Sequence, residues 1–103
     1  SLFKVTDSVS EAAEEIANFY RNYHSLRYVR DRMVIRLQKA PAEMPLKMLN
    51  RDFKDIVLPG ASMTISKALP EESEWPDLPR LVFPFNRINY GRLRQLINAL
   101  NAL

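Results

Sequence analysis

Apolar residues recur at helical spacing in the first part of this chain. Ser8 and Glu11 have the spacing of a capping box, in which the two residues satisfy backbone N–H groups at the start of a helix. The pattern predicts a helix that begins at Ser8 and fades near His24. The apolar positions that carry it are Val9, Ala12, Ala13, Ile16, Phe19, Tyr20 and Tyr23.

The same spacing predicts two further helices. One runs to about Leu58, where Pro59-Gly60 ends it. The other is capped by Asn86 or Asn89, whose side chains accept hydrogen bonds from the first free N–H groups of a helix. The apolar stripes are Leu46, Leu49, Phe53, Ile56 and Val57 in the first, and Leu93, Leu96, Ile97, Leu100 and Leu103 in the second.

Alternation of apolar and polar positions predicts the strands. Residues 26–38 read as one strand, with Arg30-Asp31 as a turn or bulge within it. Residues 62–67 form a second, short strand. Residues 80–85 form a third, which lies at a sheet edge or ends at Pro84, because proline has no N–H to donate. Residues 3–6 alternate weakly and add a candidate strand.

The predicted order is (β)αβαββα in an α+β fold, with a three- or four-stranded sheet and helices packed mainly on one face. This order resembles a ferredoxin-like unit that lacks its last strand, unless residues 2–6 supply that strand. A chain of 103 residues fits one domain. We therefore expect residues 1–103 to form a single α+β domain.

Composition and charge add a second layer to this picture. The chain is 47% hydrophobic and 26% charged, with a net charge of +3 and no cysteine, which is compatible with a reducing cytoplasm. Two zones are basic and one is acidic, and they form either solvated faces or complementary surfaces. The first basic zone comprises Arg21, Arg27, Arg30, Arg32, Arg36 and Lys39, and the second comprises Arg80, Arg87, Arg92 and Arg94. The acidic zone comprises Glu71, Glu72, Glu74 and Asp77.

The residues needed for catalysis do not converge in this sequence. There is no cysteine nucleophile, and His24, the only histidine, cannot build a multi-histidine metal site. His24 and Ser25 are neighbours without an orienting acid. Gly60 and Gly91 are the only glycines, too few for a phosphate-cradling loop. The sequence therefore predicts a non-catalytic chain without a cofactor.

Residues 19–29 are the first of three features that suit binding. This run holds three of the four tyrosines, and Tyr and Arg are typical interface anchors. It serves either core packing or docking to another domain or subunit. The candidate docking residues are Phe19, Tyr20, Arg21, Tyr23, His24, Arg27 and Tyr28.

The second feature is a candidate site for an anion, such as a nucleotide or phosphate, formed by Arg87, Asn89, Arg92 and Arg94. Arginines at the start of a helix oppose its dipole. Their charge is either exposed to solvent or offset by a bound anion or by the acidic residues 71–77.

The third feature is the mixture of arginine and tyrosine in residues 27–36. It suits RNA, although no aromatic motif of an RNA-recognition module is present. Nucleic acid is therefore the least favoured partner.

Four segments carry a resemblance to a known family: residues 19–25 (FYRNYHS), 27–29 (RYV), 78–81 (LPRL) and 90–97 (YGRLRQLI). They resemble a C-terminal extension of long bacterial members of the LOG (Lonely Guy) family, Rossmann-type nucleotide-binding proteins often labelled possible lysine decarboxylases. Leu49-Asn50, Phe53 and Ile56 add to this resemblance. Residues 2–7 look like the junction that leaves a Rossmann domain.

The resemblance implies a cytoplasmic parent protein that cleaves the N-glycosidic bond of a nucleoside monophosphate. The catalytic Gly-Gly-x-Gly-Thr-x-x-Glu type motif of that family is absent from this chain, so none of its residues can be assigned here. The implied role is that of an auxiliary domain. Its partners would be an upstream Rossmann domain or a neighbouring subunit, and the parent would form a homo-oligomer. No feature here supports pyridoxal chemistry.

Overall fold

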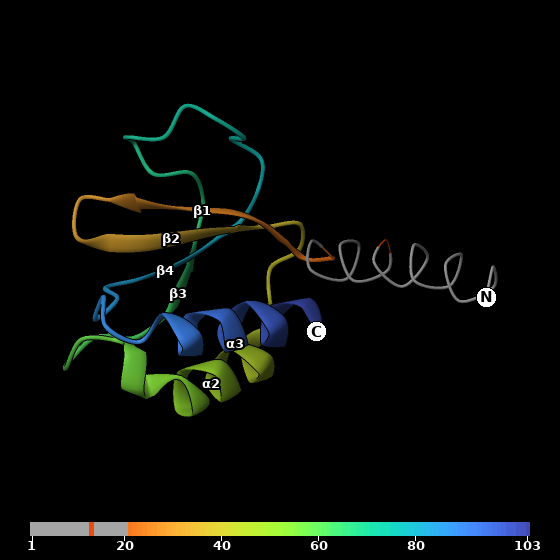
Figure 1. The fold of residues 1–103 in the computed structure, drawn as a ribbon. Helices are drawn as coiled ribbons and strands as arrows, with labels where there is room; N and C mark the ends of the chain where they lie inside the picture. Colours follow the sequence, from red (N-terminus) through yellow and green to blue (C-terminus); the bar gives the residue numbers. More distant parts are fainter. Residues whose placement is uncertain (1–12, 14–20) are drawn as a thin grey trace, which may run out of the picture.

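Four strands form an antiparallel sheet in the order β1-β2-β4-β3 (Figure 1). The computed structural model describes residue 13 and residues 21–103. Its strands are β1 (Tyr23–Val29), β2 (Arg32–Leu37), β3 (Thr64–Ser66) and β4 (Arg80–Phe83), and its helices are α2 (Glu43–Asp52), α3 (Tyr90–Asn101) and the short 3-10 helix η1 (Lys54–Ile56). The order ββαββα confirms the predicted α+β class.

The stretch predicted as one strand over residues 26–38 contains two: the turn foreseen as one alternative for Arg30-Asp31 is confirmed, whereas the start of the stretch at residue 26 is wrong. β1 begins at Tyr23, where the first helix was expected to continue, and Arg30-Asp31 forms the turn between Val29 and its register partner Arg32. The apolar spacing of residue 23 fits a helix or a strand equally, and pairing with β2 decides the matter. Residue 13 is helical; the rest of that predicted helix up to residue 20, and the candidate strand at residues 3–6, lie outside the described residues.

β2, α2 and β3 form a split β-α-β unit, because β4 lies between the two strands and is antiparallel to both. β1 pairs with the free side of β2. It therefore takes the edge position expected for the missing last strand of a ferredoxin-like unit. The alternative, that residues 2–6 supply this strand, falls outside the described residues.

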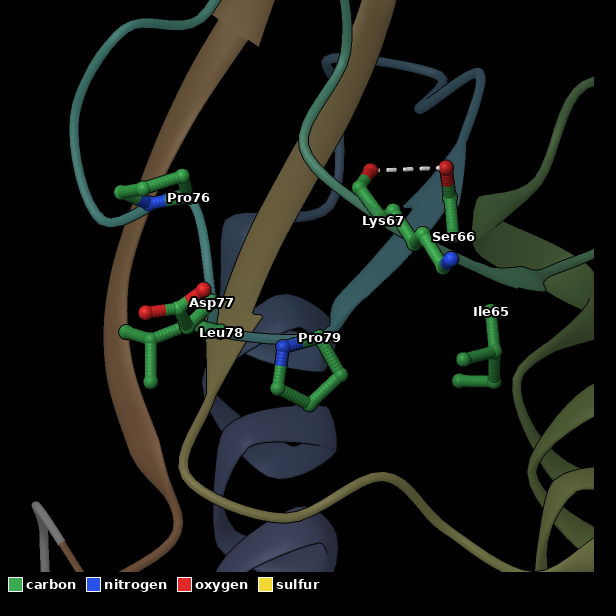
Figure 2. Close-up of a pocket in the computed structure, with 7 residues that line it drawn as sticks. All are labelled: Ile65, Ser66, Lys67, Pro76, Asp77, Leu78 and Pro79. Atoms are coloured by element: carbon green, nitrogen blue, oxygen red, sulfur yellow. Dashed lines mark hydrogen bonds between the residues drawn. The ribbon is translucent and has the colours of Figure 1, made fainter.

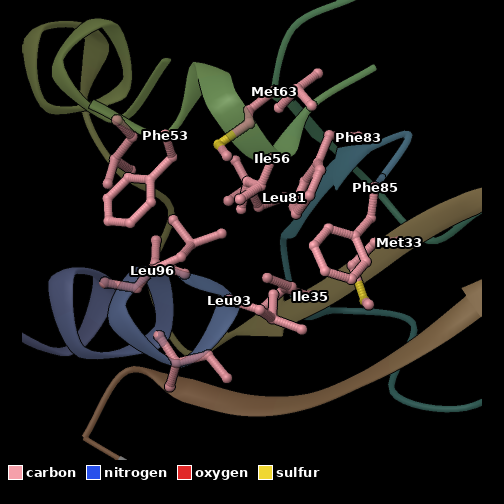
Figure 3. Close-up of a cluster of buried hydrophobic side chains, with 14 of the residues drawn as sticks. Met33, Ile35, Phe53, Ile56, Met63, Leu81, Phe83, Phe85, Leu93 and Leu96 are labelled. Atoms are coloured by element: carbon pink, nitrogen blue, oxygen red, sulfur yellow. The ribbon is translucent and has the colours of Figure 1, made fainter. Parts of the chain in front are cut away.

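The main core lies between the sheet and the two helices, which cover the same face (Figures 1 and 3). Met33, Ile35 and Leu37 of β2 face it, as their alternation predicted. The stripes predicted for the second and third helices are also buried, with Leu46 half-buried. Leu103 is the exception: it is 54% exposed, because α3 ends at Asn101.

The opposite face of the sheet is covered by residues 67–79, here called the covering loop, which joins β3 to β4 (Figure 1). A second apolar cluster lies beneath it, formed by Val29, Val34, Val82 and Leu69. Every second residue of β1, β2 and β4 therefore faces this loop. None of the described helices is long and apolar enough to cross a membrane.

The predicted ends of the elements agree with the structure only in part. The helix expected to run to about Leu58 ends at Asp52 as α2, because the backbone of Phe53 leaves the helical conformation, and η1 carries the chain on to Ile56. β4 ends before Pro84, although it is an interior strand. The side chain of Asn89 caps α3 by accepting a hydrogen bond from the N–H of Arg92 at 3.1 Å. Pro59-Gly60 lies beyond η1, and Gly60 has a φ of 84°, which glycine adopts without steric cost.

Candidate functional site

The alternation of β1 divides the predicted docking residues between the two faces of the sheet. Tyr23 is buried in the main core, and Tyr28 packs against the same core. Arg27 is exposed and pairs with Val34, which places it on the face of the covering loop. Residues 19–29 therefore do not present one continuous docking surface, which the predicted helix would have allowed.

The remaining docking candidates lie near the start of β1. Arg21 is exposed and lines a cavity of about 330 Å³ with neighbours that include Asn22, Pro41 and Leu103. His24 is half-buried, with its Nδ1 at 2.8 Å from the Ser25 hydroxyl. Phe19 and Tyr20 lie outside the described residues.

Beneath the covering loop lies a buried cluster of two arginines and one glutamate. Arg36 and Arg80 are register partners on β2 and β4, so their side chains leave the sheet side by side on one face. Glu72 joins them: its Oε2 lies 2.9 Å from Arg36 Nη2 and its Oε1 3.2 Å from Arg80 Nε. The side chains of Arg80 and Glu72 are fully buried, and that of Arg36 is 4% exposed.

Arg80 also organises the second half of the covering loop. Its Nη1 donates to the carbonyl of Trp75 at 2.7 Å and to that of Leu78, and its Nη2 donates to the carbonyl of Glu74 at 2.9 Å. A guanidinium presents five N–H groups in a rigid fork, so one side chain can bind several carbonyl groups at once. The loop between residues 74 and 78 is thus folded around Arg80.

Glu72 is held as a carboxylate in this cluster. Burial alone would raise the pKa of its carboxyl group, but the Leu69 N–H and the two guanidinium groups outweigh that effect and hold the pKa below its ordinary value. Leu69 N donates to Glu72 Oε1 at 3.3 Å. With one carboxylate facing two arginines, the cluster carries a net charge of +1.

The pairing between Arg36 and Glu72 is incomplete. Arg36 Nε is buried and has no hydrogen-bond partner among the described residues. Glu72 Oε2 is close to Arg36 Nη2, but no donor of the described residues is aligned with it. Arg36 Nη1 donates to Ser25 Oγ at 3.0 Å. Buried polar groups are nearly always satisfied, so an unmatched guanidinium N–H is a notable feature.

Trp75 covers this cluster from the solvent side. Its ring lies 5.0 Å from the Arg36 guanidinium carbon and 4.6 Å from the centre of the His24 ring. The side chain stays 44% exposed, and its φ of 47° is uncommon for a bulky residue. The bond from Arg80 to its carbonyl stabilises this backbone conformation. Trp75 therefore lies as a lid over Arg36.

The predicted anion-binding residues have partners of their own. Arg87 stacks on Tyr28 at 4.4 Å and donates to the Arg30 carbonyl, whereas Arg92 pairs with Asp55 at 3.2 Å and stacks on Phe53. Asn89 is the cap of α3, and Arg94 is exposed with contacts of its own. The two arginines thus reach toward different elements. Asp55 of η1, rather than the covering loop, offsets the charge at the helix start.

A second exposed aromatic group lies at the far end of β1. The hydroxyl groups of Tyr28 and Tyr90 are 3.4 Å apart, and Tyr90 packs edge-on against Phe85. Burial, followed by the hydrogen bond to Tyr90, raises the pKa of Tyr28. Next to them Ile88 is 82% exposed. Arg87, which stacks on Tyr28, lies here as well, so this end of the sheet combines aromatic and apolar side chains with an arginine.

A cavity lined by described residues lies between β3 and the end of the covering loop (Figure 2). It has a volume of about 450 Å³ and is lined by Ile65, Ser66, Lys67 and residues 76–79. Lys67 and Asp77 are its only charged residues, and both are exposed. No three metal-ligating side chains cluster anywhere in the part of the chain that the structure describes.

The sequence did not predict the cluster of Arg36, Glu72 and Arg80, because its pattern places each of these residues at a solvent-exposed position. Arg36 and Arg80 alternate with apolar residues, and Glu72 lies in a proline-rich acidic stretch. The sequence feature that could have indicated the cluster is the presence of two basic zones and one acidic zone. The reading as complementary surfaces is correct for these three residues, and for Arg32 and Glu71, which lie 4.0 Å apart.

Comparisons with known proteins found no match to this chain. No family model matches it, and neither a curated protein nor a solved structure does so.

Proposed function

We propose that this chain is a non-catalytic auxiliary domain that docks on the Rossmann domain, or on a neighbouring subunit, of a LOG-type protein that hydrolyses nucleoside monophosphates. The assignment to such a parent rests on the sequence resemblance of residues 19–29, 78–81 and 90–97. The docking role rests on the surface around Trp75.

Trp75 has the properties of an interface anchor. It is large and exposed, and its position is held by three neighbours: His24 and Arg36 contact the ring, and Arg80 binds the carbonyl. A side chain that is already ordered loses little conformational entropy on binding. Tryptophan and arginine are also the residue types that contribute most to binding energy at interfaces. The docking surface we propose comprises His24, Arg27 and Trp75.

The test measures the affinity of this chain for the Rossmann domain encoded with it. Trp75→Ala should weaken binding by about 30-fold, the loss typical of an interface anchor. Ile88→Ala, at the far end of β1, removes an apolar side chain that is even more exposed than Trp75 and should leave the affinity within about twofold. Equal affinities for wild type and Trp75→Ala would refute the docking surface.

The absence of catalysis is tested separately. The isolated chain, incubated with nucleoside monophosphates, should release no ribose 5-phosphate. Measurable release would contradict the proposal, whatever the binding experiment shows. The alternative function, anion sensing through Arg87, Asn89, Arg92 and Arg94, has less support, because Arg87 and Arg92 contact different protein groups.

A further inference from the structure

We propose that Arg36 and Arg80 form a binding site for a phosphate group, and that Glu72 occupies this site as an internal ligand while the covering loop is closed. The site lies on the face of the sheet opposite the helices. It uses residues different from those at the start of α3, and it does not depend on the docking role.

The charge of the cluster favours an anion of higher charge than a carboxylate. Two guanidinium groups face one carboxylate in a site that is almost fully buried. An unbalanced charge in such a place is costly, since low-dielectric surroundings do not screen it. A phosphate monoester dianion would neutralise both arginines, and arginine is the residue best suited to bind phosphate through paired N–H groups.

The unused donor gives a second, independent argument. A carboxylate has two oxygen atoms, and Glu72 places one near each arginine. Arg36 Nε has no acceptor among the described residues and Glu72 Oε2 has no aligned donor, so the planar carboxylate fits the Arg36 guanidinium poorly. A phosphate monoester has three terminal oxygen atoms, so the third oxygen can accept from this N–H. The Ser25 hydroxyl, which already accepts from Arg36 Nη1, lies at the same end of the site.

The bonds of the covering loop indicate which part would move. Arg80 holds the carbonyl groups of residues 74, 75 and 78, so the second half of the loop is fixed. The first half is held by burial of Leu69 at its start, by the partly exposed pair of Glu71 and Arg32, and by Glu72 through its side chain and the bond from its N–H to the Leu69 carbonyl. Pro70, Glu71 and Ser73 are exposed. Release of Glu72 would therefore open the site by moving residues 70–73 alone.

Trp75 provides the readout, since it is the only tryptophan and lies over Arg36. The folded chain is titrated with sodium phosphate at constant ionic strength, with sodium chloride as the balancing salt. We expect a saturable change in tryptophan emission with phosphate and none with chloride. Glu72→Gln removes the competing charge and should bind phosphate at least ten times more tightly than wild type. Glu71→Gln, the adjacent exposed acid, should change the affinity less than twofold.

Two results would overturn the proposal. One is an emission that responds to phosphate no more than to chloride in the wild type and in Glu72→Gln. The other is equal phosphate affinity in Glu71→Gln and Glu72→Gln. If Glu72→Gln does not fold, the wild type decides the matter through ¹H–¹⁵N spectra of the arginine Nε–H groups. A saturable shift of the Arg36 Nε–H signal with phosphate supports the site, and an unchanged signal refutes it.

Discussion

Arg36 and Arg80 are register partners on adjacent strands, and a single carboxylate from the covering loop lies between their guanidinium groups. Two like charges directly opposite each other destabilise a sheet unless a counter-charge intervenes. Glu72 supplies that charge from a segment that is separated from β2 by α2 and β3. The covering loop is thus fixed to the sheet by electrostatics and hydrogen bonds, with Leu69 as its buried apolar contact.

Glu72→Gln should lower the free energy of unfolding by about 3–5 kcal/mol, because it leaves two buried guanidinium groups without a counter-charge. Urea denaturation followed by circular dichroism measures the change. The matched control is Glu71→Gln, whose partner Arg32 is 4.0 Å away and partly exposed. We expect the control to cost less than about 0.5 kcal/mol. Similar costs for the two variants would contradict the buried cluster.

The contribution of Glu72 should depend on pH in a defined direction. Its pKa in the folded state is below the ordinary value of 4.5, so the folded state favours the ionised form. The stabilisation is therefore fully present above about pH 4.5 and is lost as the pH falls through the pKa of the folded state. The difference in unfolding free energy between wild type and Glu72→Gln should shrink on acidification below that point. A difference that stays constant would argue against an ionised Glu72.

Asn101→Ala should separate the start of β1 from the end of α3. The Asn101 Oδ1 accepts hydrogen bonds from the backbone N–H groups of Asn22 and Tyr23, at 2.7 and 2.8 Å, and the site is buried. The variant leaves two buried donors unsatisfied, which should cost about 2 kcal/mol or more. Amide hydrogen exchange at Tyr23 should accelerate accordingly. Asn98→Ala, an exposed position on the same helix, should leave exchange at Tyr23 unchanged.

Arg30→Gly should stabilise the hairpin between β1 and β2. Arg30 has a φ of 58° at the first position of a two-residue turn, where glycine adopts positive φ without steric cost. We expect a gain of about 0.5–1 kcal/mol, read from the urea midpoint. The bond from Arg87 to the Arg30 carbonyl persists, since glycine keeps that group.

The neighbouring turn residue provides the control for this hairpin. Asp31 does not have a positive φ. Asp31→Gly should therefore destabilise the protein slightly, because it adds freedom to the unfolded chain without relieving any strain. If both glycine variants change stability in the same direction, the positive φ of Arg30 is not the cause.

Local patterns predicted the elements of this fold well where one face of the element is buried. The alternation in β2 and β4 and the stripe of Leu93, Leu96, Ile97 and Leu100 in α3 are confirmed. Such patterns depend on residues a few positions apart, which share a face. The boundary of the first predicted helix was wrong because Tyr23 fits both periods, and pairing with Leu37 of β2 selected the strand.

The buried positions of Arg36, Glu72 and Arg80 could not be predicted from the spacing of apolar and polar residues. The sequence marks the two arginines as polar positions facing away from the main core, and this is correct. It does not indicate whether that face meets solvent or protein. The register between β2 and β4 brings the two arginines together, and the covering loop then excludes water from them.

The amino-acid sequence alone was therefore enough to assign the fold class, the apolar faces of β2 and α3, an asparagine cap at the start of α3 and the end of β4 before Pro84, since each depends on local spacing and on the chemistry of asparagine and proline. Only the tertiary structure decided that β1 completes the sheet, that Trp75 lies over Arg36, and that one glutamate joins two buried arginines. These features depend on contacts between distant segments. Their free energy comes from desolvated charges and strand pairing, which exist only after the chain has folded.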